Sequence, residues 1–330
     1  MAITANEKVL TLDYWKPARK LRVGDYVFDK DGNVVQIKLV QEYRSEDCYE
    51  VTFNDYLSMR GDQNLGFPTE TPKHRKRMHE YKGKFKFRRP LKPLKVKDFQ
   101  ATSLKTKYNR LAFSVQTAKP LELPHQYLPV PPFIFGFWLF GRKAGKKFVA
   151  TQGKTEEVAE KFKDHGYKLV FHKLMSNGER NFSVTPSIES QLAPNVPSKI
   201  PNNYLLASVE QRTELLKGIL CAKHRLYSPK TDTFRYTSSH FGSVTQIQYL
   251  VESLGIKTKL FHDTILNNYV LTFKTRIKLV SHQVSPPVKV HFGRRFITSI
   301  TPIPAQSCIH IETTGSDNTI LVGEGFIPCL

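Results

Sequence analysis

The middle of the chain repeats one order of elements twice, and this duplication restricts the fold more than any other feature. Each copy reads as an apolar helix, a second, amphipathic helix and two strands. The first copy comprises residues 133–141, 155–165, 167–174 and 181–185. The second comprises residues 208–220, a hairpin over 227–239, and residues 244–254, 257–262 and 268–273. The repeat predicts a pseudo-twofold unit in which helices pack on strands.

Residues at the predicted helix ends support these assignments. Thr155 precedes two glutamates and Gly166 follows the helix, as at a capped N-terminus and a glycine C-cap. Ser208 and Gln211 have the spacing of a capping box. Gly255 stands where the second helix of the second copy should end.

Both ends of the chain favour short β-strands. Residues 8–12, 20–28, 34–40 and 49–53 contain alternating or β-branched runs, with a hairpin tip at Asp31-Gly32 and a turn expected over residues 13–17. The last stretch repeats the pattern at residues 308–312 and 319–322. We therefore expect an all-β module assembled from both ends of the chain.

The charge balance indicates a polyanionic partner. Fifty Lys and Arg residues against 29 Asp and Glu residues give a formal charge of +21, far beyond what solubility needs. A basic but merely soluble chain is the alternative. The four cysteines show no zinc-ligand spacing, and we expect them to be reduced and mostly buried. We expect no cofactor, no metal, no signal peptide and no membrane span.

Residues 71–110 are strongly basic and contain interleaved aromatic residues. Phe85 and Phe87 have the spacing that anchors a strand, with Lys84, Lys86 and Arg88 facing outward. Such a segment can lay positive charge along a phosphate backbone. The alternative is a solvated surface face.

The two ends resemble the Hint (hedgehog/intein) fold. The resemblance rests on KVLTLDYWKPARKLRVGDYVFDKDGN and DCYEVTF near the start and on LVGEGFIP near the end. It implies a nucleophile at the position of Ala2 and a histidine near Asn64. It also implies that the last strand continues into His-Asn, where this chain has Cys329 and Leu330. Because these groups are absent, we expect no protein splicing.

The duplicated middle resembles LAGLIDADG homing endonucleases, and the order of the two resemblances is that of phage terminase-type inteins. The signature helices correspond to FGFWL at 135–139 and LKGIL at 216–220. The resemblance implies close helix packing at Gly136 and Gly218, and a metal-binding acid at the end of each helix. Gly141 and Lys223 occupy those ends instead. Basic residues there cannot ligate a divalent cation but suit phosphates.

We therefore expect an α+β protein with a Hint-like β module at 1–70 and 286–330, a basic arm at 71–128 and a LAGLIDADG-like unit at 129–285. The predicted function is binding of double-stranded DNA without catalysis, through the arm and a basic saddle formed by the strands of that unit. The candidate phosphate-binding residues are Lys73, Arg75, Lys76, Arg77, Lys84, Lys86, Arg88, Arg89, Arg142, Lys143, Lys146, Lys147, Lys223 and Arg225.

Two other functions remain open at this point. One is a phage structural or interaction protein, including a virion component. The other is an active nuclease that uses the displaced acids Glu156 or Asp232. The expected location is the cytoplasm of a phage-infected bacterium or the virion, and the sequence does not predict the oligomeric state.

Overall fold

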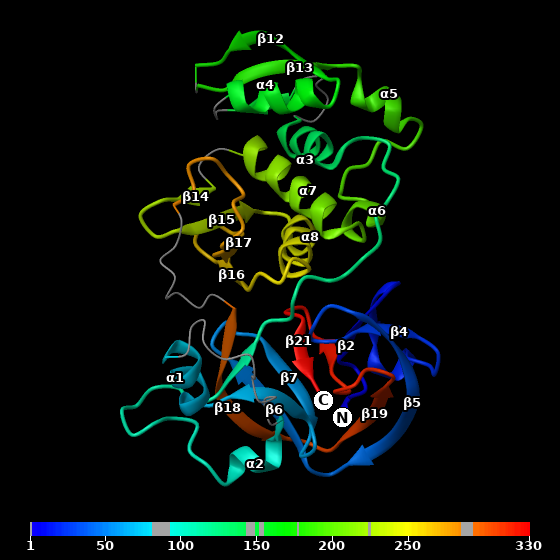
Figure 1. Ribbon diagram of the computed structural model, residues 1–330, viewed down its shortest axis with the longest axis vertical. Helices are drawn as coiled ribbons and strands as arrows, with labels where there is room; N and C mark the ends of the chain where they lie inside the picture. The colour runs from blue at the N-terminus through cyan, green and yellow to red at the C-terminus, as the bar shows by residue number, and fades with distance from the viewer. Residues whose placement is uncertain are drawn as a thin grey trace. The chain divides into compact units, whose positions relative to one another are not determined.

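The computed structural model describes residues 2–80, 93–142, 149–151, 155–176, 178–223, 226–284 and 293–330. The chain forms two compact units, each made of more than one segment (Figure 1). The first unit comprises Met1–Leu121, Gly255–Lys259 and His291–Leu330. The second comprises Glu122–Leu254 and Leu260–Val290. In the described residues no helix is long and apolar enough to cross a membrane.

The first unit is mainly β. Its early strands are β1 (Ala2–Thr4), β2 (Lys8–Thr11), β3 (Tyr14–Pro17), β4 (Tyr26–Phe28), β5 (Val34–Ser45), β6 (Cys48–Phe53), β7 (Ser58–Asp62), β8 (Gly66–Glu70), β9 (Pro93–Lys95) and β10 (Ser114–Gln116). The late strands are β18 (Arg294–Ile303), β19 (Gln306–Thr313), β20 (Ile320–Val322) and β21 (Ile327–Cys329). The helical elements are a 3₁₀ turn at Ala18–Lys20, α1 (Pro72–Glu80) and α2 (Val96–Gln100).

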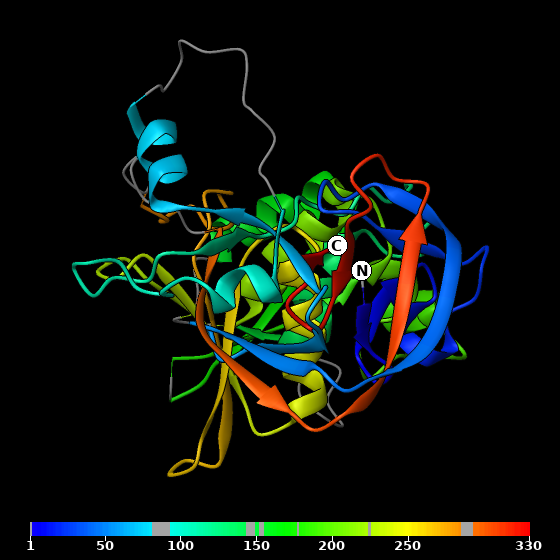
Figure 2. The same cartoon turned by 90° about the horizontal axis from the view of Figure 1, so that it is seen from below.

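Strands from the two ends of the chain alternate within one sheet. β19 lies between β1 and β5, and β18 lies between β6 and β10. Figure 2 shows the orange β19 running beside the blue β5. The register pairs Ile3 of β1 with Ile309 of β19 and Val51 of β6 with Ile300 of β18. Neither end can therefore complete the unit alone, which confirms the predicted module built from both ends.

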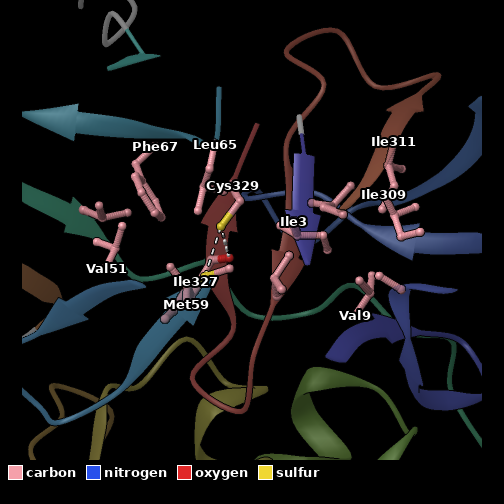
Figure 3. Packing of buried hydrophobic residues seen from close by; sticks show 14 of the residues in the cluster. Ile3, Val9, Val51, Met59, Leu65, Phe67, Ile309, Ile311, Ile327 and Cys329 are labelled. Atoms are coloured by element: carbon pink, nitrogen blue, oxygen red, sulfur yellow. Dashed lines mark hydrogen bonds between the residues drawn. The ribbon is translucent and has the colours of Figure 1, made fainter. Parts of the chain in front are cut away.

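One apolar core holds this sheet together. Ile3, Val9, Phe67 and Ile309 are at most 1% exposed, and they pack with Ile327 from the last strand (Figure 3). Burying each such side chain stabilises the fold by about 1.5–3 kcal/mol. The alternation of apolar residues in the short strands supplies this core.

The start of the unit differs from the sequence prediction at one turn. Residues 14–17 form strand β3, paired with β2, where a turn over 13–17 was expected. The Thr11 hydroxyl donates to the Tyr14 carbonyl at 2.7 Å and accepts from the Asp13 amide at 3.2 Å. This local hydrogen bonding tightens the reversal, so that Tyr14 takes a φ of 83° and the chain returns immediately as a strand.

The predicted basic arm at 71–128 is not a separate body. Its residues up to Leu121 belong to the first unit, where β9 and β10 both pair with β8. Phe99 is 2% exposed and stacks edge-on against Phe113, which joins this segment to the core. The strand predicted around Phe85 and Phe87 lies outside the described residues.

The second unit contains two sheets and six helices in its described residues. The helices are α3 (Pro132–Gly141), α4 (Thr155–Asp164), α5 (Ile188–Leu192), α6 (Asn202–Leu205), α7 (Val209–Ala222) and α8 (Phe241–Glu252). The strands are β11 (Val149–Thr151), β12 (Lys168–Leu174), β13 (Arg180–Thr185), β14 (Tyr227–Ser228), β15 (Thr233–Ser238), β16 (Thr258–Asp263) and β17 (Asn268–Phe273).

The strand orders confirm the predicted duplication. One sheet runs β11-β13-β12 and the other β14-β15-β17-β16. In both, the strand before the second helix pairs with the last strand of the copy. The helix ends also agree with the sequence: Ser208 and Gln211 form a capping box, and Gly166 and Gly255 take positive φ values. α8 begins at Phe241, three residues earlier than expected.

Glycines hold the two signature helices, α3 and α7, side by side (Figure 1). A Cβ at Gly136 would lie 2.5 Å from the carbonyl oxygen of Leu215, and one at Gly218 would lie 2.1 Å from that of Phe133. Real Cβ atoms essentially never approach that closely. The predicted close packing at these two glycines is confirmed.

Candidate functional site

The resemblance to LAGLIDADG homing endonucleases implies a metal site at the C-terminal ends of α3 and α7. Arg142 follows α3, and its Nη2 donates to the Pro197 carbonyl at 2.7 Å while the guanidinium lies 4.6 Å from the centre of the Trp138 ring. Lys223 follows α7 and is exposed. Gly141 is buried. Arg142 thus fixes a loop onto its helix, a role that the sequence analysis did not foresee.

The described residues near the end of α7 include carboxylates: Glu157 and Glu214 act electrostatically on Cys221 in the last turn of that helix. No cluster of three or more His, Cys, Asp or Glu residues in the part of the chain that is described could hold a metal ion. Glu156 lies in the first turn of α4. Asp232 lies in the β14–β15 turn, where its carboxylate accepts from the Tyr227 hydroxyl at 2.9 Å. Among the described residues, Arg142 and Lys223 therefore place positive charge at the two helix ends.

The predicted arm residues in α1 are of two kinds: exposed lysines and an arginine that points inward. Lys73 and Lys76 are exposed. Arg75 points inward: its Nη1 donates to the Glu70 carbonyl at 2.8 Å and to Ser114 Oγ at 3.1 Å, and it lies 5.1 Å from the centre of the Phe296 ring. Arg75 was predicted to contact phosphate, but its guanidinium ties α1 to β8 and β10.

Nine other predicted phosphate contacts cannot be placed. The side chain of Arg77 and all of Lys84, Lys86, Arg88, Arg89, Lys143, Lys146, Lys147 and Arg225 lie outside the described residues. Their roles stay predictions.

The four-stranded sheet of the second unit has one face covered by helix α8. The opposite face, here called the open face, carries exposed side chains around the fully buried Val270. Phe234, Tyr236 and Leu271 are buried on the face toward α8, which lies against β15 and β17 (Figure 1). Because side chains alternate along a strand, Arg235 and Thr237 point from the other face, and both are exposed. A basic and a hydroxyl side chain thus stand together on an open sheet.

An apolar side chain joins this open face. His262 stacks on Tyr269 at 4.7 Å, and Tyr269 contacts Phe241 of α8 at 4.9 Å, so His262 lies on the covered face. Phe261, one residue earlier, therefore lies on the same face as Arg235. It is 42% exposed.

The three-stranded sheet repeats the arrangement. Phe171 pairs with the buried Phe182 at 5.6 Å on the face toward α4, which lies against β12. Lys168 and Thr185 are cross-strand partners on the opposite face, and both are exposed. Each copy of the repeat thus presents exposed cations and an exposed hydroxyl from this face: Lys168 and Lys173 with Thr185 in the first copy, and Arg235 and Lys259 with Thr237 in the second. A basic saddle was expected from the sequence, but these residues were not among the predicted contacts, although the period-two alternation of polar and apolar residues in the strands points to them.

Of the positions that the resemblance assigns to splicing, Ala2 lies in β1 and Cys329 in β21, whereas Asn64 lies in a turn and Leu330 follows β21. Ala2 is 1% exposed and packs against Cys48 and Cys308. The amide of Asn64 donates to Asp62 Oδ1 at 2.7 Å and its side chain to Oδ2 at 3.1 Å, so Asn64 holds a turn. Tyr43 Oη donates to the same carboxylate at 2.6 Å.

The last two residues are anchored by backbone and sulfur contacts. Leu330 exchanges two hydrogen bonds with Gly66, at 2.8 and 3.0 Å. The Cys329 thiol is fully buried, and its Sγ lies 3.3 Å from Met59 Sδ (Figure 3). Burial raises the pKa of this thiol well above its usual range, and Cys329 packs within the apolar core of the first unit.

No protein-family model matches the chain. Among curated proteins it is similar to the replicative DNA helicase DnaB of Mycobacterium intracellulare, with 23% identity over 336 residues that cover 95% of this chain and 55% of the helicase. The chain therefore spans about half the length of that relative.

The similar solved structures are of two kinds. One kind includes the MchDnaB-1 intein (23% identity, TM-score 0.20, 21% of this chain and 53% of the intein) and the gp41-1 intein (16%, 0.23, 34% and 73%). The other includes the homing endonuclease I-DmoI in complex with DNA and Mn (12%, 0.32, 48% and 98%). These are the two families that the sequence resembles.

Proposed function

We propose that this chain is a binding protein for double-stranded DNA, built on an intein-like and endonuclease-like fold and free of splicing and nuclease activity. The carrying observation is that each open sheet of the second unit presents an exposed cation beside an exposed hydroxyl, Lys168 with Thr185 and Arg235 with Thr237. Such side chains suit phosphates and the base edges of the major groove.

The overall charge supports a nucleic-acid partner. A formal charge of +21 gives long-range attraction to a polyanion. Lys73 and Lys76 add exposed charge on α1 of the first unit. Because these contacts would go to phosphates, they position the protein without giving base specificity.

The residues at the ends of α3 and α7 support binding without cleavage. A nuclease of this architecture needs carboxylates there to hold Mg²⁺. Arg142 and Lys223 supply positive charge and no oxygen ligand. Such residues favour phosphate and disfavour a divalent cation.

The proposal is tested by mixing the purified chain with a labelled duplex in buffers containing Mg²⁺ or Mn²⁺. Fluorescence anisotropy measures binding, and a denaturing gel of the same samples measures the length of each strand. The expected result is saturable binding with both strands intact. Cleavage that disappears in Glu156→Gln or Asp232→Asn would support the nuclease instead. Absence of binding at low salt would refute the DNA-binding proposal.

A further inference from the structure

Two cysteines from opposite ends of the chain meet in the first unit. Cys48 begins β6 and Cys308 lies in β19, 260 positions later, and their sulfur atoms are 3.8 Å apart. Both are free thiols, at most 1% exposed. Rotation of the two side chains about their Cα–Cβ bonds moves the sulfur atoms toward the distance of about 2 Å that a disulfide requires.

The surroundings of Cys48 and Cys308 favour a disulfide between these two residues over one with either of the other cysteines. Ala2 packs directly against both cysteines, with Tyr43 and Ile303 at the border of the cluster. Cys329 contacts Met59 instead, and Cys221 belongs to the second unit.

We propose that Cys48 and Cys308 are an oxidation site that forms a reversible disulfide and closes a covalent clasp between the two sequence halves of the first unit. The oxidant is hydrogen peroxide, which is small enough to reach a buried thiol when the strands open briefly. The site is independent of DNA binding.

The chemistry balances in two steps. The Cys48 thiolate attacks one peroxide oxygen, the O–O bond breaks, and the departing hydroxide takes up a proton to become water, leaving a sulfenic acid. Cys308 sulfur then attacks Cys48 sulfur, the S–O bond breaks, and the hydroxide leaves as water with the Cys308 proton. Two thiols lose two electrons, and one peroxide becomes two waters.

The buried position of the two thiols makes their oxidation slow. Burial, together with the neighbouring Cys48 thiol and the Asp62 carboxylate, raises the pKa of Cys308 to about 12. Since the thiolate is the nucleophile, a raised pKa lowers reactivity at neutral pH. The clasp should therefore close only under sustained oxidation.

The consequence is mechanical. β6 belongs to the N-terminal segment of the first unit and β19 to its C-terminal segment, and the residues between them include the whole second unit. A disulfide that closes so long a loop restricts the unfolded chain strongly. The oxidised first unit should therefore resist thermal unfolding better than the reduced one.

The test is peroxide treatment of the folded full-length chain, followed by alkylation of remaining thiols and mass spectrometry. The expected product has two alkylatable thiols instead of four and one cross-linked peptide pair containing Cys48 and Cys308, and a thiol reductant restores all four. Cys221→Ser and Cys329→Ser should still lose a pair of thiols, whereas Cys48→Ser and Cys308→Ser should not.

Other outcomes would overturn the inference. Four alkylatable thiols after treatment, or a cross-link that involves Cys221 or Cys329, would contradict it. If Cys308→Ser fails to fold, Cys48→Ala also removes one member of the cysteine pair and serves instead. Detection of the cross-linked peptides in the unmodified chain requires no variant. A disulfide that forms only after denaturation would also count against the site.

Discussion

Gly218 of α7 lies directly against the backbone of Phe133 in α3, so that a Cβ there would sit 2.1 Å from the Phe133 carbonyl oxygen. The close packing of α3 and α7 therefore depends on the absence of a side chain at position 218. Because the obstacle is backbone, it cannot rotate away as a flexible side chain would.

Gly218→Ala should destabilise the second unit by about 3 kcal/mol or more, since the helices must separate to admit the methyl group. Thermal unfolding followed by circular dichroism measures the change. Gly242→Ala is the matched control: Gly242 is a helical glycine with nothing within 4 Å of its would-be Cβ. It should be neutral or slightly stabilising, and equal losses in both variants would contradict the packing account.

Glu7 gives the first unit a pH dependence between 4.5 and 7. Burial raises its pKa from 4.5 to about 7, against the opposing effect of the Arg60 amide that donates to its carboxylate at 3.2 Å. The folded state therefore holds a proton that the unfolded state has lost, and stability falls as pH rises through this window. The total loss is up to about 3 kcal/mol.

Glu7→Gln should remove that loss. The variant's stability relative to the unmodified chain should rise between pH 4.5 and 7 and stay level above pH 7. Urea titrations at several pH values measure it. Glu46→Gln, at an exposed position, is the control and should not alter the slope. A parallel pH profile for Glu7→Gln would contradict the assignment.

A buried ion pair joins the two halves of the first unit. Glu70 in β8 is fully buried and its carboxylate bonds to the Arg294 guanidinium of β18, with a further hydrogen bond from Ser114 at 3.3 Å. Arg294→Met would leave the carboxylate without its charged partner, which should cost about 3–5 kcal/mol. Arg44→Met breaks an exposed pair and should cost less than about 1 kcal/mol.

Chemical denaturation compares the two variants. Combining Arg294→Met with Glu70→Leu should recover much of the loss, because no unpaired charge then remains buried. A double variant as unstable as, or less stable than, Arg294→Met alone would show that packing, rather than the buried charge, causes the effect.

Local sequence signals predicted most of the elements but few of the contacts that join them. The Ser208–Gln211 capping box and the alternation in β15 and β17 act within a few residues, so they can be read directly. The pairing of Cys48 with Cys308 and the inward turn of Arg75 depend on strands that are distant in sequence. No periodicity or spacing carries that information. Arg75 and Arg142 were therefore predicted as surface cations although both bond to protein carbonyls.

The most direct test of the central claim is duplex-DNA affinity across a salt series, for the unmodified chain and for the double variant Lys168→Ala with Arg235→Ala. The logarithm of the affinity should fall linearly with the logarithm of salt concentration, and the double variant should lower that slope by about 2. The control, Lys20→Ala with Arg44→Ala, removes the same charge from exposed positions of the first unit and should leave the slope nearly unchanged. Affinity that does not depend on salt, or equal slopes in all three proteins, would contradict DNA binding through the open sheets.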